Sequence, residues 1–156
     1  MNANSSKRLE QNENKTAAPC IFCDIVASKA PASIVYEDVH TLAFMNLNQL
    51  NDGHVLIIPK AHFVNVFDIP SETLGHVIQT VKRVCHLIKA NLGISDLSIW
   101  QSNGAKAGQD VWHLHYHVLP RLQEGELRGF YSHTPKRPLR QELDQIALKI
   151  KGNHHE

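Results

Sequence analysis

The chain has 156 residues, of which 42% are hydrophobic and 20% are charged, and its formal net charge at pH 7 is +1. This length suits one domain with tails, large enough to bury a core without disulfides. The near-neutral charge does not indicate a nucleic acid or a membrane surface as the partner. No apolar run approaches the roughly 20 residues of a membrane helix, and the N-terminus lacks an apolar signal core. We therefore expect a cytoplasmic protein whose three cysteines stay reduced.

Composition divides the chain into three parts. Residues 1–18 are rich in Asn, Ser, Lys, Gln and Glu, which is typical of a disordered tail. Residues 19–125 alternate apolar segments with turn signals, as one folded domain would. Residues 126–156 form a C-terminal extension, in which a basic, proline-containing stretch leads into an amphipathic helix and a flexible end.

Strands are predicted along most of the domain. The segment CIFCDIVAS, from residue 20, reads as a short helix or turn that is closed by Pro31. Runs rich in β-branched and aromatic residues then predict strands at residues 33–36, 41–45, 54–59, 96–103 and 111–120. A glycine-bearing loop, GAKAGQ, separates the last two.

The clearest helix follows Pro70, with Ser71 as its N-cap and Gly93 as its end. Its apolar positions recur at steps of three and four: Leu74, Val77, Ile78, Val81, Cys85, Ile88 and Leu92. We therefore predict an α+β domain with an antiparallel sheet of about five strands, one long helix packed on the sheet and a shorter C-terminal helix.

Three histidines alternate in WHLHYHVLP, at His113, His115 and His117. On a strand they would share one face, about 6.6 Å apart along the backbone, while apolar residues take the other face. This spacing is too wide for all three rings to chelate one ion, but two of them could flank one substrate group. The alternative interpretation is a solvated strand face that carries histidine by chance.

The segment HLHYHVLP resembles the His-x-His-x-His-x-x motif of the histidine triad (HIT) family of nucleotide hydrolases and transferases. Three further segments match in the family's order: CIFC at residues 20–23, NDGHVLIIPKAHF from residue 51, and AGQ just before the triad. The resemblance runs from Cys20 to about Arg121. It implies a HIT-like fold and a homodimer.

The resemblance also implies a reaction. His115 would attack the α-phosphorus of a purine nucleotide derivative, and water would then hydrolyse the nucleotidyl-histidine and release AMP. His117 would bind the phosphate and assist the leaving group, and His54 would support both. The second ring nitrogen of His115 must donate to an acceptor, for which the family uses a backbone carbonyl. Adenosine 5′-phosphoramidate-type or adenylated compounds are the expected substrates.

A phosphate site is expected in the loop before the triad. Glycines at 104 and 108 let backbone N–H groups approach phosphate oxygens, and the Gln109 side chain would assist. On the sugar side, Asn46 replaces the Asp that holds the ribose hydroxyls in many members, and amides also bond hydroxyls. Apolar residues implied to line a purine pocket are Ile25, Phe44 and Leu47; packing in the core is the default role of each.

Two positions depart from the family's pattern on the phosphate side. Ser102 stands where bacterial relatives carry Asn, which shortens one contact. Asp110 stands where several branches carry Ser or Thr near the scissile phosphate. Because a carboxylate that faces the substrate would repel it, either Asp110 points away or the preference for the leaving group differs.

Cys20 and Cys23 have the spacing of two zinc ligands, although two unrelated cysteines would look the same. The bacterial branch of the family completes such a site with two histidines, which correspond to His62 and His113. The resemblance thus implies a Cys2His2 zinc site with a structural role, since a closed four-coordinate ion leaves no position for water.

Three other functions remain open from the sequence. One is hydrolysis of dinucleoside polyphosphates by the same residues. Another is a nucleotide-binding regulatory module with little catalysis, against which the presence of His115 argues. The last is an interaction protein structured by zinc, which would have no affinity for nucleotides.

Overall fold

The computed structural model describes residues 19–124 and 134–152, so the tail predicted for residues 1–18 lies outside the described residues. The elements in chain order are α1 (Ile21–Val26), β1 (Ile34–Glu37), β2 (Thr41–Met45), β3 (Val55–Pro59), α2 (Ser71–Leu92), β4 (Leu97–Gln101), the 3-10 turn η1 (Ala105–Ala107), β5 (Tyr116–Pro120) and α3 (Arg140–Lys151). No helix in these ranges is both long enough and apolar enough to cross a membrane.

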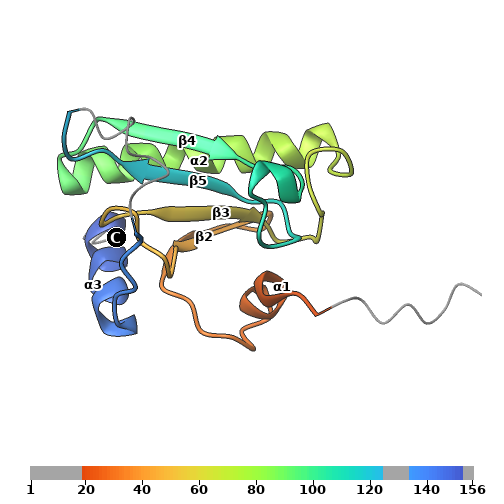
Figure 1. Cartoon of the computed structure of the whole chain (residues 1–156), viewed down its shortest axis with the longest axis horizontal. Helices are drawn as coiled ribbons and strands as arrows, with labels where there is room; N and C mark the ends of the chain where they lie inside the picture. Colours follow the sequence, from red (N-terminus) through yellow and green to blue (C-terminus); the bar gives the residue numbers. More distant parts are fainter. Residues whose placement is uncertain (1–18, 125–133, 153–156) are drawn as a thin grey trace, which may run out of the picture.

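The strands form one five-stranded sheet in the order β1-β2-β3-β5-β4, with every neighbouring pair antiparallel (Figure 1). The predicted α+β architecture is thus confirmed. β2 and β3 pair along their whole length, and β5 then inserts between β3 and β4. This order puts the strand that carries His117 near the middle of the sheet, where both of its neighbours restrain it.

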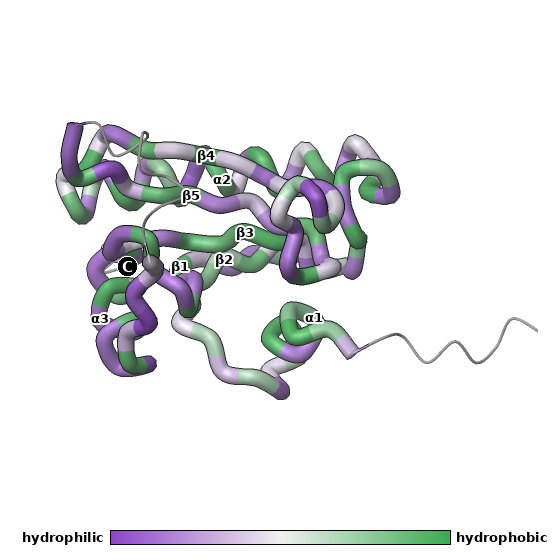
Figure 2. Tube along the Cα trace, viewed as in Figure 1, coloured by the Kyte–Doolittle hydropathy of each residue, from purple (hydrophilic) through white to green (hydrophobic). Residues whose placement is uncertain are grey.

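Both faces of the central strands are buried. Every residue of β2 and of β3 is buried, which accounts for their continuous apolar runs. Figure 2 shows hydrophobic colour along most of β3 and a paler β4 at the sheet edge. Alternate side chains divide between two clusters: Ala43, Met45, Val55 and Ile57 pack with α2, whereas Leu42, Phe44, Leu56 and Ile58 pack with Phe22 of α1.

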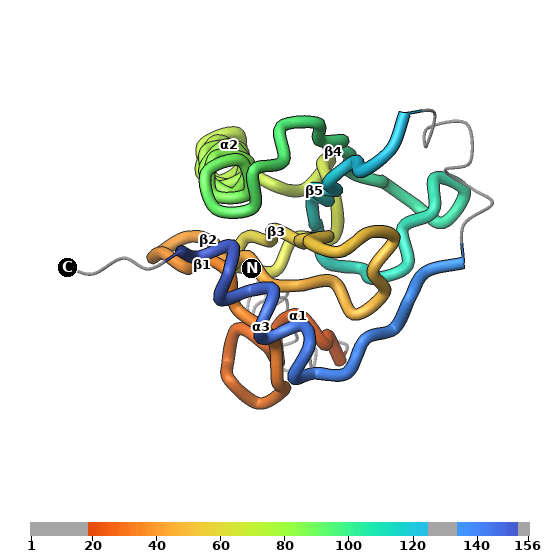
Figure 3. Tube along the Cα trace, turned by 90° about the vertical axis from the view of Figure 1, so that its left-hand side faces the viewer, coloured from red at the N-terminus to blue at the C-terminus, as the bar shows by residue number. Residues whose placement is uncertain are grey.

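The helices cover the sheet unequally. α2 lies on one side of the sheet and α1 on the other, as the turned view in Figure 3 shows. α2 ends as predicted at Gly93, whose φ of 71° is easiest for glycine, but its N-cap is Pro70, one residue before the predicted Ser71. α3 packs along β1 and against α2 through Leu143, Ala147 and Ile150. Among the described residues, the short helix α1 covers part of this second face, and a cavity opens beside it.

Candidate active site

The strand predicted at residues 111–120 is wrong in its first half, because β5 begins only at Tyr116. Pairing with β3 ends at Ile57, opposite Tyr116. Two residues further along β3, the carbonyl of Pro59 accepts a hydrogen bond from His113 Nε2 at 2.9 Å. A side-chain contact there replaces the backbone pairing of two strands. The three histidines therefore do not share one strand face, and His113 and His115 are set by the chain that leads into β5.

Four predicted zinc ligands meet beside α1. The ligand atoms of Cys20, Cys23, His62 and His113 all lie within 4.8 Å of one another. His113 Nδ1 is 3.5 Å from the sulfur of Cys20 and 3.6 Å from that of Cys23, and His62 Nδ1 is 3.3 Å from the sulfur of Cys23. Zinc bond lengths of about 2.3 Å to sulfur and 2.0–2.1 Å to nitrogen give a tetrahedral S–N edge of roughly 3.6 Å. The cluster therefore fits a tetrahedral Cys2His2 zinc site.

Hydrogen bonds to neighbouring groups orient two ligands of the same cluster. The bond from His113 Nε2 to the Pro59 carbonyl leaves the Nδ1 lone pair directed at the two sulfurs, as metal-binding histidines require. The Cys20 sulfur also accepts the backbone N–H of Cys23 and so caps the first turn of α1. The site would thus fasten α1 to the segment that carries the triad.

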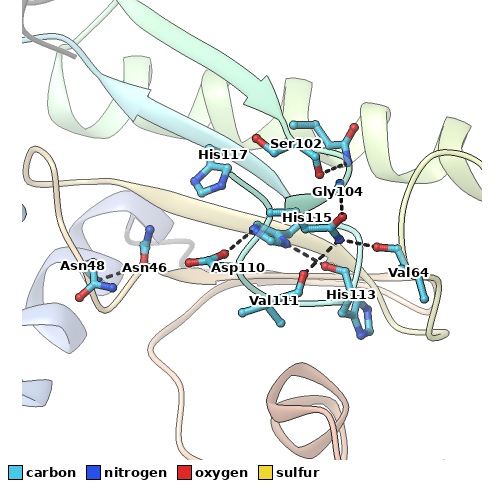
Figure 4. Close-up of polar contacts among 12 residues, drawn as sticks. Asn46, Asn48, Val64, Ser102, Gly104, Asp110, Val111, His113, His115 and His117 are labelled. Carbon is cyan, nitrogen blue, oxygen red and sulfur yellow. Dashed lines mark hydrogen bonds and ion pairs between the residues drawn. The ribbon is translucent and has the colours of Figure 1, made fainter. Parts of the chain in front are cut away.

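His115 has the orientation that a nucleophilic imidazole needs. Its Nδ1 donates to the carbonyl of His113 at 2.8 Å, so the lone pair lies on Nε2. The ring is 4% exposed and packs edge-on against Phe22, with ring centroids 5.3 Å apart. Asp110 lies on the Nε2 side, with Oδ1 at 3.7 Å, and Figure 4 shows the two side chains pointing toward each other. Of the two alternatives for Asp110, the structure has the one in which the carboxylate faces the site.

His117 stands next to His115 in a buried group of rings. Its Nδ1 is 2.9 Å from Nε2 of His54, and its ring stacks on Trp100 at a centroid distance of 4.3 Å and an angle of 4°. Burial, with the neighbouring His115 and His54, lowers the pKa of His117 to about 2, and burial lowers the pKa of His54 to about 4. Both rings are therefore uncharged at neutral pH.

A cavity of about 490 Å³ opens in front of these histidines, within the size range of ligand pockets. His54, His115, His117 and Asn46 line it, with the Asn46 amide 3.5 Å from the His54 ring. The three apolar residues predicted for a purine pocket, Ile25, Phe44 and Leu47, line it too. The residues predicted as catalytic and as nucleoside-binding therefore share one cavity.

The predicted phosphate loop has a different arrangement. Ser102, Gly108 and Gln109 are not among the described residues that line the cavity. Gln109 donates to the carbonyls of Val64 and Val111 and accepts the Gly104 N–H at 2.8 Å, so its side-chain amide is bonded to backbone inside the loop (Figure 4). In this structure Gln109 organises the loop, and the acidic group beside His115 Nε2 is Asp110, at 3.7 Å.

Several residues that line the cavity were missed from the sequence, among them Trp100, Pro135 and Arg140. Trp100 pairs with His117 in the register of β4 and β5. Pairing of the strands predicted at residues 96–103 and 111–120 in this register would have placed Trp100 beside His117. Pro135 and Arg140 come from the C-terminal extension, and no motif there indicates a site.

Comparisons with known proteins agree with this geometry. The HIT domain family model matches residues 27–124. An uncharacterised HIT-like protein of Methanocaldococcus jannaschii is 38% identical over 134 residues, which cover 85% of this chain and 99% of that protein. The adenosine 5′-monophosphoramidase of Saccharomyces cerevisiae is 36% identical over 107 residues, 69% of this chain and 65% of the enzyme.

A solved structure extends the comparison to the metal. A zinc-bound histidine triad family protein from Mycobacterium smegmatis superposes with a TM-score of 0.74 at 30% identity, covering 85% of this chain and 90% of that one. The triad, the cysteine pair and the sheet order thus occur together with a family match over most of the folded chain. The chain belongs to the histidine triad (HIT) family.

Proposed function

We propose that this protein hydrolyses nucleoside 5′-phosphate derivatives at the α-phosphorus, with His115 as the nucleophile, and releases AMP from adenosine 5′-phosphoramidate-type or adenylated substrates. The observation that carries the proposal is the bond from His115 Nδ1 to the His113 carbonyl, which leaves the Nε2 lone pair on the cavity side. The yeast relative, an adenosine 5′-monophosphoramidase, supports the phosphoramidate class.

The reaction would take two displacements. First, His115 Nε2 forms a bond to phosphorus while the bond from phosphorus to the leaving nitrogen or oxygen breaks, and the leaving group takes a proton from solvent. Water then attacks phosphorus and gives up a proton to solvent, the bond to Nε2 breaks, and AMP is released with His115 restored. His117, held by His54 and Trp100, would contact the phosphate and the leaving group. Asn46 would bind the ribose hydroxyls.

The zinc ion would serve the fold. When bound, it supplies a closed tetrahedral link between α1 and the His113 segment, without an open position for water. His113 carries the carbonyl that orients His115, so the same residue joins the metal site to the nucleophile. We assign the chemical step to the chain's own histidines.

A homodimer in the cytoplasm completes the proposal. β4 is an outer strand of the described sheet, and Ile99 on it is 50% exposed, which suits pairing with a second copy. Light scattering should give twice the chain mass, whereas a monomer at micromolar concentration would contradict this part of the proposal. A glutamate in place of Ile99 should shift the equilibrium toward monomer.

The catalytic proposal is tested with an adenosine 5′-phosphoramidate reporter. We expect His115→Ala to lower AMP release by at least about a thousandfold, because the nucleophile is lost. His86→Ala, on the exposed surface of α2, is the matched control and should keep wild-type activity. Equal AMP release by wild type and His115→Ala would exclude nucleophilic catalysis by His115. AMP affinity in calorimetry without any turnover would favour the regulatory module.

A further inference from the structure

The C-terminal extension forms part of the cavity wall, beyond the residues matched by the family model. Lys136 pairs with Gln49 through two backbone bonds of 2.8 and 2.9 Å. The Gln49 side chain is fully buried and donates to the carbonyls of Asn46 and His54. The extension is therefore fastened to the loop that presents Asn46 and His54 to the cavity.

Arg140, the first residue of α3, is the cationic side chain among the described cavity-lining residues. One guanidinium nitrogen donates to Ser33 Oγ at 3.0 Å, and the other donates to the Pro31 carbonyl at 3.3 Å. A guanidinium carries more N–H donors than these two contacts use, and no ion pair of Arg140 occurs among the described residues. Its orientation is thus fixed while donors remain for a ligand.

Arg140 and His115 lie toward opposite ends of the cavity. Arg140 is held by Ser33, next to β1, whereas His115 precedes β5, and β2 and β3 lie between those strands. Three strand spacings of about 4.8 Å separate β1 from β5 by roughly 14 Å. Asn46 and apolar side chains line the same cavity. A nucleotide with its phosphate at His115 and its ribose at Asn46 would thus extend its base toward Arg140.

We propose that Arg140 selects the base: it donates to acceptor atoms on the base edge and favours the 6-oxopurines guanine and hypoxanthine over adenine. Guanine and hypoxanthine present O6 and N7 side by side as acceptors, which match the guanidinium fork. Adenine presents N7 beside an amino group, and a guanidinium has no acceptor for that donor. The preference rests on the proposed function for the position of the phosphate, and it leaves the reaction unchanged.

The test compares guanosine, inosine and adenosine 5′-phosphoramidates. We expect the wild type to have higher kcat/KM with the two 6-oxopurines. Arg140→Ala should lower those values by about tenfold and change the adenosine value less than about twofold. Arg140→Lys keeps the charge without the planar fork and should retain only part of the preference. Arg137→Ala, exposed in the same segment, is the matched control.

Two results would overturn the proposal. One is a wild type that prefers adenosine. The other is a ratio of kcat/KM between the guanosine and adenosine substrates that is the same in Arg140→Ala as in the wild type. The ratio stays unchanged if both values fall together, as the loss of a merely structural contact would cause, or if neither falls. Calorimetric affinities for GMP, IMP and AMP give the same ratio without turnover. If the wild type hydrolyses none of the compounds, the proposed function fails, and the affinity ratio still decides the role of Arg140.

Discussion

Asp110 places a carboxylate beside Nε2 of His115, where, in the proposed reaction, its charge would act on the leaving group. The two side chains approach to 3.7 Å, and the Asp110 side chain is 79% exposed on the cavity side. A carboxylate repels a leaving group that departs as an anion, whereas it can accept an N–H from a departing amine. We therefore predict that the protein cleaves phosphorus–nitrogen bonds in preference to phosphoanhydrides.

Replacing this carboxylate should change the preference between leaving groups. For Asp110→Asn we expect kcat/KM with a dinucleoside polyphosphate to rise a few-fold and kcat/KM with the phosphoramidate to fall, because solvent screening limits the effect of an exposed charge. Steady-state kinetics with both substrates measures the ratio. A ratio equal to that of the wild type would show that Asp110 does not act on the leaving group.

Burial of His54 makes stability depend on pH. Its pKa falls from 6.5 to about 4 in the folded chain, mainly because burial disfavours the charged ring. Between these values the unfolded state binds more protons than the folded state. The contribution of the uncharged His54 ring to the free energy of unfolding is therefore complete above about pH 6.5. It is lost as the pH falls toward 4, by at most about 1.4 kcal/mol per pH unit.

The substitution His54→Gln removes this titration and tests the account. Urea unfolding at about pH 7 and about pH 5 should show a larger loss of unfolding free energy for the wild type than for the variant. Loss of zinc on acidification affects both proteins alike, so the difference isolates His54. Equal losses would mean that His54 is not the source of the pH dependence.

Among the elements, α1 depends most on the metal. It has six residues and is shorter than a helix that is stable alone. Its N-cap, Cys20, and Cys23 in its first turn both belong to the zinc cluster. An ion present at about a hundred times its Kd stabilises the fold by about 2.7 kcal/mol. Its removal should lower Tm by roughly 5–10 °C.

Chelation and Cys23→Ser should both produce this loss. At temperatures below the unfolding transition we expect kcat to stay close to the wild-type value although Tm falls, since we assign the chemical step to the histidines. Cys85→Ser is the matched control, because Cys85 lies on α2 outside the metal cluster. A protein that keeps both its Tm and its activity without bound zinc would contradict a structural role for the ion.

The sequence predicted elements well where a local signal marks their ends. Gly93 ends α2, and three members of the predicted apolar stripe, Val77, Val81 and Ile88, are buried. The stripe was wrong at Ile78, which is 44% exposed, and it missed Val84, which is buried. The start of β5 was wrong because period-two alternation continues through His113 and His115, while their actual positions depend on Pro59 and on the cysteines. Alternation in sequence does not distinguish a strand from a segment extended by its side-chain contacts.

At the scale of the whole molecule, motifs predicted the half of the cavity that holds the histidines. The other half depends on contacts between distant parts of the chain: Arg140 reaches Ser33 over 107 positions, and Lys136 pairs with Gln49. Neither contact follows from composition or periodicity, because both join segments that lie far apart in the chain. The proposed base end of the site therefore became visible only in the folded chain.

The central claim is that phosphorus is transferred twice, to His115 and then to water. The stereochemistry at phosphorus tests it most directly, using a chiral adenosine 5′-phosphorothioate amidate hydrolysed in oxygen-18 water. Each displacement inverts the phosphorus centre, so the account predicts net retention of configuration in the product. Net inversion would mean that water attacks the substrate in one step, and it would contradict the account.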